Sequence, residues 1–134
     1  MNNMDVFNLI ALEVFHLSLE SFPIPVDTSR KKIAESVSGY LEIIESKADE
    51  KILEDQVGYT VWWLRDEQFI TLKREALNGS FSASLTQKGL NAVNSNPQAL
   101  ETKKSFRELF YQGLANLPFT VASGTMVEFF KSSG

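Results

Sequence analysis

The single histidine is the first side chain to consider for acid–base or metal chemistry. His16 follows Glu13 by three residues and precedes Glu20 by four, so the three side chains share one face of a helix. One imidazole and two exposed carboxylates make a poor ligand set for zinc and an unsupported general base. We therefore interpret His16 as a solvated residue on a polar stripe, and we predict no metal site.

Three pairs of acidic neighbours, Asp49/Glu50, Glu54/Asp55 and Asp66/Glu67, are the next candidates for chemistry. Adjacent residues on a helix diverge by about 100°, so none of these pairs can form an acid–base couple. The chain has no cysteine, and it lacks a phosphate-binding glycine loop and a nucleophile motif. These features predict a protein that is not an enzyme and needs no cofactor.

The composition predicts one domain over residues 1–134, because 43% hydrophobic content with ten Phe can form a core without a metal or disulfide. No Lys or Arg precedes Arg30, and polar residues interrupt the apolar stretch before it. We therefore expect neither a signal peptide nor a membrane span, and a cytoplasmic location. The net charge of −4 repels nucleic acid at long range, so DNA binding would need a local basic patch.

Hydrophobic periodicity predicts six helices, at about 5–20, 29–45, 49–67, 87–94, 101–114 and 118–131. In the first helix, only a narrow polar stripe is expected to face water: Asp5, Asn8, Glu13, His16 and Glu20. The third helix has a main apolar stripe at Leu53, Val57, Thr60, Val61 and Leu64. A second stripe (Ile52, Tyr59 and Trp63) lies beside it, and we assign Trp63 to the core.

A β-hairpin is predicted where residues 69–74 and 81–85 flank Asn78-Gly79, a sequence typical of a two-residue type I′ turn. That turn would pair Leu72 with Leu85 and Arg74 with Ala83. One face of the hairpin would then be apolar (Leu72, Ala76, Phe81, Ala83 and Leu85), and the other would be polar (Thr71, Lys73, Glu75, Ser80, Ser82 and Ser84).

Two segments beside this hairpin carry a resemblance. Residues 63–70 read W-L-R-D-E-Q-F-I and residues 85–90 read L-T-Q-K-G-L. They resemble the W-L-x-x-E-G-F-I … L-T-x-K-G-L pattern of bacterial and phage winged-helix proteins, many of which are transcription regulators. The resemblance covers about residues 50–95. It implies a mainly α fold with a small β-hairpin: a winged-helix unit at about 29–95, with an N-terminal helix at 4–20 and C-terminal helices at 101–131. Gln68 replaces the family's usual Gly, so we expect the third helix to end without a left-handed glycine.

The first functional hypothesis is a dimeric winged-helix DNA-binding protein, as the resemblance implies. Basic residues of the hairpin and of the second helix would contact phosphates, namely Lys73, Arg74, Lys88, Arg30, Lys31 and Lys32. The third helix would approach the groove with Gln56, Tyr59 and Thr60. This helix carries six acids and two bases over residues 49–67, which argues against groove reading. The alternative for the basic residues is ordinary surface charge.

The second hypothesis is a protein-interaction module of the same fold. Trp62 follows Gly58 by four residues on the wetter side of the third helix, where it could anchor a partner or pack beneath the terminal helices. The terminal helices contain more apolar surface than a three-helix unit needs to cover. They would form a homodimer layer through Phe119, Met126, Phe129 and Phe130, or complete a larger monomeric core.

Overall fold

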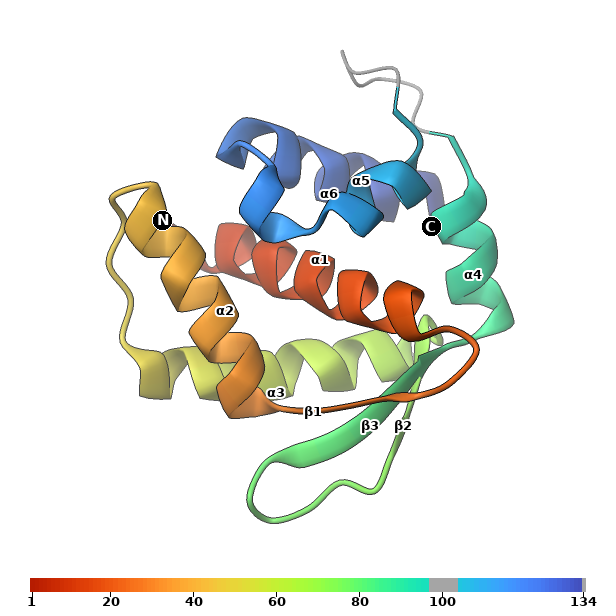
Figure 1. Ribbon diagram of the computed structural model, residues 1–134, viewed down its shortest axis with the longest axis horizontal. Helices are drawn as coiled ribbons and strands as arrows, with labels where there is room; N and C mark the ends of the chain where they lie inside the picture. Colours follow the sequence, from red (N-terminus) through yellow and green to blue (C-terminus); the bar gives the residue numbers. More distant parts are fainter. Residues whose placement is uncertain (97–103, 134) are drawn as a thin grey trace.

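The computed structural model describes residues 1–96 and 104–133, and these ranges contain six α-helices and a three-stranded antiparallel sheet (Figure 1). The elements in chain order are α1 (Asn3–Ser21), β1 (Val26–Ser29), α2 (Arg30–Ile43), α3 (Glu50–Asp66), β2 (Ile70–Lys73), β3 (Ser80–Leu85), α4 (Gln87–Asn94), α5 (Phe106–Gln112), a 3-10 turn η1 (Leu114–Asn116) and α6 (Phe119–Ser133).

Helix α1 lies at the centre of the molecule, with α5 and α6 on one side, α3 on the other and α2 across its end (Figure 1). Other helices cover α1 on almost every side, which explains why almost every side of it is apolar. The predicted polar stripe is therefore wrong in part: Asn8 and Glu13 are buried, while Glu20 is exposed. A capping box of Asn2 and Asp5 fixes the start of the helix.

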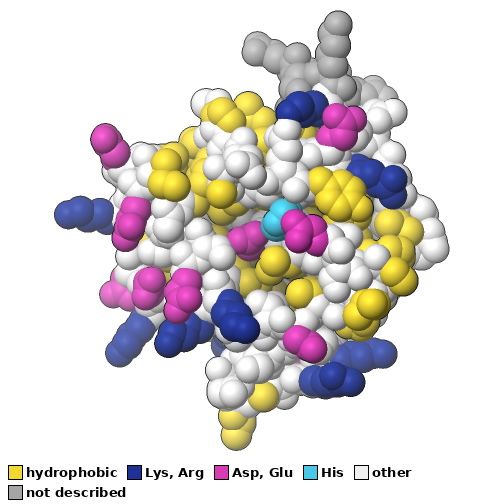
Figure 2. All heavy atoms as spheres, viewed as in Figure 1, with side chains coloured by type: hydrophobic (Ala, Val, Ile, Leu, Met, Phe, Trp, Pro, Cys, Tyr) yellow, Lys and Arg dark blue, Asp and Glu magenta, His cyan; other side chains and the backbone are white. Residues whose placement is uncertain are grey.

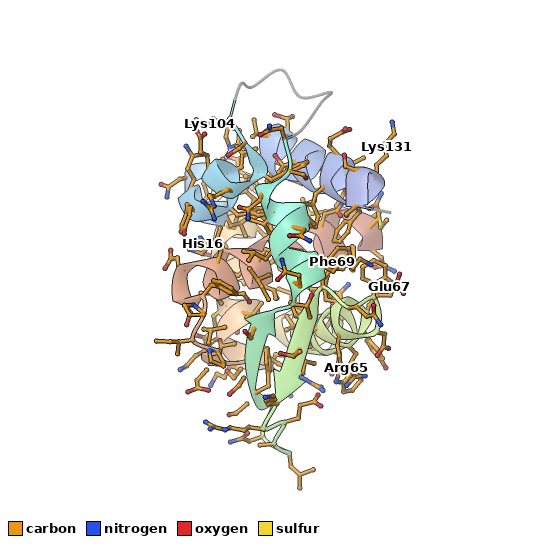
Figure 3. The ribbon with its side chains drawn as sticks, turned by 90° about the vertical axis from the view of Figure 1, so that its right-hand side faces the viewer. His16, Arg65, Glu67, Phe69, Lys104 and Lys131 are labelled. Carbon is orange, nitrogen blue, oxygen red and sulfur yellow. The ribbon has the colours of Figure 1, made fainter. Side chains whose placement is uncertain are left out.

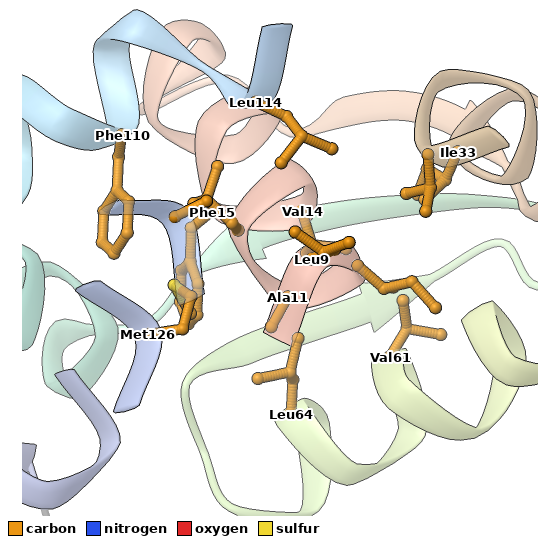
Figure 4. Packing of buried hydrophobic residues seen from close by; sticks show 14 of the residues in the cluster. Leu9, Ala11, Val14, Phe15, Ile33, Val61, Leu64, Phe110, Leu114 and Met126 are labelled. Atoms are coloured by element: carbon orange, nitrogen blue, oxygen red, sulfur yellow. The ribbon is translucent and has the colours of Figure 1, made fainter. Parts of the chain in front are cut away.

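The core is a continuous apolar cluster around α1, and Figure 4 shows Phe15 of α1 between Phe110 and residues of α3. Two residues predicted to contact a partner, Met126 and Phe129, are fully buried within this cluster. That prediction is wrong for both residues, because α6 turns its apolar face towards α1 of the same chain. The terminal helices thus supply a large part of the core within this chain.

Polar side chains cap the predicted helix starts. Ser29, Asp49 and Thr86 each accept a hydrogen bond from the first turn of α2, α3 and α4 respectively. The fifth helix begins later than predicted, after the cap Ser105, and it ends before Gly113, whose φ is 76°. The predicted start at residue 101 lies outside the described residues. The last helix agrees with its prediction.

The sheet has the order β1-β3-β2, so the hairpin gains a third strand that periodicity did not predict. Residues 26–29 form β1, a strand of four residues, which is too short to show a clear alternation. In the sheet, Asp27 pairs with Ser82 and accepts a hydrogen bond from its hydroxyl. Ser82 is consequently buried on the face that was expected to be polar.

The predicted hairpin register is wrong by two residues: Leu72 pairs with Ala83, and Ile70 pairs with Leu85. The cause is the turn. Gly79 has a positive φ of 88° and Asn78 does not, so the loop is a type I turn followed by a left-handed glycine rather than type I′. Arg74, with φ of 56°, adds a further irregular residue. A shift of two keeps each side chain on its predicted face, except that Ala76 becomes an exposed loop residue.

Gln68 ends α3 in the left-handed conformation, with φ of 66°, and the Phe69 amide donates to the Leu64 carbonyl at 2.9 Å. The geometry that glycine normally provides at a helix end is therefore kept by a residue with a side chain, at a cost of roughly 1–2 kcal/mol. Among the described residues, no helix combines the length and the apolar character needed to cross a bilayer.

Candidate functional site

The outward face of α3 is apolar where water would favour polar side chains. Ile52, Tyr59 and Trp63 are 59%, 70% and 42% exposed. The assignment of Trp63 to the core is therefore wrong, because the main stripe of α3 already fills the contact with α1 and α2. Trp63 instead packs edge-on against Phe7 of α1, with ring centroids 5.2 Å apart, and against Phe130 of α6 at 5.5 Å.

These aromatic side chains line an open groove of about 730 Å³ between the start of α1, the outer face of α3 and the end of α6. Residues from four helices and the α3–β2 junction form it: Asn3, Met4, Phe7, Gln56, Tyr59, Thr60, Trp63, Glu67, Phe69, Lys88, Phe130 and Ser133. We call this the α3 groove. Its volume and mostly apolar lining are those of a site that binds a ligand or a partner segment.

Lys88, predicted to contact phosphate beside the hairpin, lies in the α3 groove. Its Nζ donates to the Glu67 carbonyl at 2.8 Å and stands 4.6 Å from the centre of the Phe69 ring. Figure 3 shows Glu67 and Phe69 on the α3 side of α4, away from the hairpin loop. Lys88 of α4 therefore connects this helix to the end of α3.

Trp62 is half-buried and already has partners within the chain. Its Nε1 donates to Glu75 Oε1 at 2.8 Å, and the guanidinium of Arg30 lies 4.7 Å above its ring. The same guanidinium covers the bare backbone of Gly58, where an added Cβ would lie 2.7 Å from Arg30 Cζ. The absence of a side chain at Gly58 thus makes room for Arg30, and the free anchor surface predicted for Trp62 is occupied.

The structure brings the two predicted basic runs together at the hairpin end of the molecule. The Arg30 amide donates to the Gly79 carbonyl at 3.1 Å, which joins the start of α2 to the hairpin loop. Lys31, Lys32, Lys73 and Arg74 are all exposed, and Lys and Arg side chains gather along this lower rim in Figure 2. Arg30 itself is committed to Trp62.

The three residues of α3 predicted to read a DNA groove all line the α3 groove, but they differ in exposure. Tyr59 is exposed and Gln56 is half-buried. Thr60 is buried, and its hydroxyl donates to the Gln56 carbonyl at 2.7 Å, so it is unavailable to DNA. Among the predicted C-terminal contacts, Phe119 and Phe130 are half-buried, and Phe130 borders the groove.

No protein-family model, curated protein or solved structure matches this chain. The winged-helix resemblance therefore rests on the two sequence segments alone.

Those two segments have a structural role in this molecule. The Thr86 hydroxyl donates to the carbonyls of Gln68 and Phe69 while it caps α4 through the Gly89 amide. Together with Lys88 on the Glu67 carbonyl, these bonds fasten α4 to the end of α3. The two sequence segments therefore explain how α4 is attached to the end of α3. They do not identify a ligand.

His16 is not the solvated residue that was predicted. Its Nδ1 lies 2.6 Å from the Phe110 carbonyl and its Nε2 lies 2.9 Å from Glu20 Oε1, so it connects α1 to α5. Among the described residues, no three His, Asp or Glu side chains are placed to hold a metal ion.

Glu13 is the buried acid beside His16, with only 7% of its surface exposed. Burial raises the pKa of Glu13 above its ordinary value of 4.5, and Glu20 raises it further, while His16 and a hydrogen bond with Ser36 oppose the rise in part. The sequence contained one signal for this residue, its spacing from His16, but helix periodicity placed it on the wet stripe.

We expect Glu13→Gln to remove a pH dependence of stability. The pKa of Glu13 is higher in the folded state than in the unfolded state. Above about pH 4.5, the folded state therefore holds more protons than the unfolded state does. The wild-type protein therefore loses stability from there up to the raised pKa, whereas the Gln variant does not. Urea unfolding from pH 4 to 8 measures the difference, with Glu42→Gln, an exposed site on α2, as the control. Parallel curves for wild type and Glu13→Gln would contradict it.

Proposed function

We propose that this protein is an interaction module that binds an amphipathic, basic helical segment of a partner protein in the α3 groove. The observation that supports this is the exposed aromatic stripe of α3, which continues into a groove bordered by α1 and α6. Helical segments commonly bind in such grooves through apolar residues spaced three and four apart.

The acidic charge of α3 favours a basic partner. Residues 49–67 contain six acids and two bases, a net charge of −4, which equals the net charge of the whole chain. On the helix surface, Asp55 is a neighbour of Tyr59, and Asp66 and Glu67 are neighbours of Trp63. A segment with an apolar face and Lys or Arg along its flank matches this arrangement. The negative phosphates of DNA do not.

The proposal is tested with a fluorescent peptide of about 18 residues, or five helical turns, that has a Leu face and Lys flanks. A scrambled peptide of the same composition controls for charge alone. By anisotropy we expect the amphipathic peptide to bind at least about tenfold more tightly than the scrambled one, and Tyr59→Ser to weaken binding by roughly tenfold. Ile52→Ser is the matched control, because Ile52 is exposed on the same stripe but does not line the groove.

Equal binding of both peptides, or an unchanged affinity in Tyr59→Ser, would overturn the proposal. A second copy of the chain is the competing occupant, in line with the predicted homodimer. Sedimentation of the protein distinguishes the two: a dimer that Tyr59→Ser abolishes would make the groove a self-interface, whereas a monomer supports an external partner.

Nucleic-acid binding is a second candidate, favoured by the joining of the two basic runs at the hairpin end. Lys73 and Arg74 would contact phosphates without reading sequence. If they do, affinity for random duplex DNA falls with salt, and a Lys73→Ala/Arg74→Ala variant loses about two from the log–log salt slope, at about 0.9 per phosphate contact. No binding at low salt removes this candidate and leaves the α3 groove proposal unaffected.

A further inference from the structure

A second cavity, of about 420 Å³, lies on another side of α1, between α2 and the turn that follows α5. Glu13 and His16 of α1, Glu35 and Ser36 of α2, and Gln112 and Asn116 at the end of α5 and in η1 provide its polar lining. In Figure 2 the imidazole of the only histidine is visible near the centre of this face, beside acidic side chains.

Gly39 of α2 leaves this cavity open. A Cβ built at Gly39 meets no atom within 4 Å, and the residue has no positive φ. Glycine weakens a helix interior relative to alanine, so it normally reflects a tight contact or a special backbone conformation. Here neither reason holds, and the effect of the missing side chain is free space at the cavity wall.

The charges around the cavity are acidic. Glu13 is more than nine-tenths buried and Glu35 stands on the facing helix, while no Lys or Arg contributes to the described lining. The imidazole of His16 is bonded to Glu20 and the Phe110 carbonyl, and it offsets the effect of burial on Glu13 only in part. Burying a carboxylate is costly unless a cation pairs with it. A positively charged ligand would supply that cation, and Ser36, Gln112 and Asn116 would accept its remaining hydrogen bonds.

We propose that this cavity binds a small organic cation, a primary amine or guanidinium on a short carbon chain. The cationic head pairs with Glu13 and Glu35, and the chain occupies the space in front of Gly39. The site is independent of the α3 groove, because the two cavities share no lining residue.

Calorimetric titration with putrescine and agmatine tests the site, with 1,4-butanediol as a neutral probe of similar length. We expect both amines to bind and the diol not to bind. Glu13→Gln should weaken amine binding at least tenfold by removing the buried charge, and Gly39→Leu should do so by filling the cavity. Glu42→Gln, on the same helix but outside the lining, should leave the affinity unchanged. Circular dichroism confirms that each variant is folded.

Proton release gives a second measurement. Burial raises the pKa of Glu13, which is faced by His16, Glu20, Glu35 and Tyr40, and pairing with a cation favours the ionised carboxylate. Binding should therefore release protons over the pH range in which Glu13 of the free protein keeps its proton. The release is seen as a heat that depends on the buffer's ionisation enthalpy, and Glu13→Gln should show none of it. No heat from either amine, equal binding of the diol, or affinities unchanged in both Glu13→Gln and Gly39→Leu would overturn the proposal.

Discussion

Replacing Phe129 with alanine is expected to lower the free energy of unfolding by about 3–5 kcal/mol. Phe129 is fully buried. Its ring lies 4.9 Å from Phe15, 5.3 Å from Phe110 and 5.4 Å from Phe106, centroid to centroid. Truncation removes the buried area of the ring, leaves a cavity between rigid neighbours, and loses several edge-to-face aromatic contacts.

Thermal and urea denaturation measure this effect, and a fall in melting temperature of about 10–20 °C is expected for a domain of this size. Phe119→Ala on the same helix is the control. Phe119 is only half-buried, so its truncation should cost less than about 2 kcal/mol. A Phe129→Ala variant that keeps wild-type stability but loses self-association would contradict the buried placement. It would restore the interface role that was predicted for this residue.

The sequence predicted the existence of the helices, and most helix starts other than that of α5, because these depend on local chemistry. Thr86 and Asp49 cap the helices that follow them, and the main apolar stripe of α3 is buried as its spacing predicts. The faces of the hairpin were also correct, since a register error of two residues preserves side-chain alternation. The turn type was wrong because Asn-Gly is compatible with more than one loop length.

The candidate sites were harder to predict because they depend on how α1 and α6 lie relative to α3. From the sequence, an apolar residue such as Trp63 is assigned to the core whether or not another helix covers it. The opposite error occurred at Glu13, where a charged residue read as surface although α2 and the turn after α5 close over it. Periodicity assigns a residue to a face of its own helix. It does not say which face the rest of the chain covers.

Gly89→Ala is expected to destabilise the protein by about 2–3 kcal/mol, in the range of overpacked sites. An added Cβ would lie 2.2 Å from the Phe69 carbonyl oxygen and 3.3 Å from Leu85 Cδ2. The carbonyl cannot move aside without cost, because it accepts hydrogen bonds from the Thr86 amide at 3.0 Å and the Thr86 hydroxyl at 3.1 Å. The substitution therefore separates α4 from the end of α3, and the helix-propensity gain of about 1 kcal/mol does not offset the loss.

Gly39→Ala is the matched control for Gly89→Ala, because it makes the same chemical change in a helix where the new methyl group meets nothing within 4 Å. That variant should gain about 0.5–1 kcal/mol in urea unfolding, from helix propensity and reduced freedom of the unfolded chain. Opposite signs for the two substitutions would show that the Gly of the L-T-x-K-G-L segment is required by the close approach of α4 to Phe69. Equal effects would mean that α4 does not pack against the Phe69 carbonyl, and the segment would then need a different explanation.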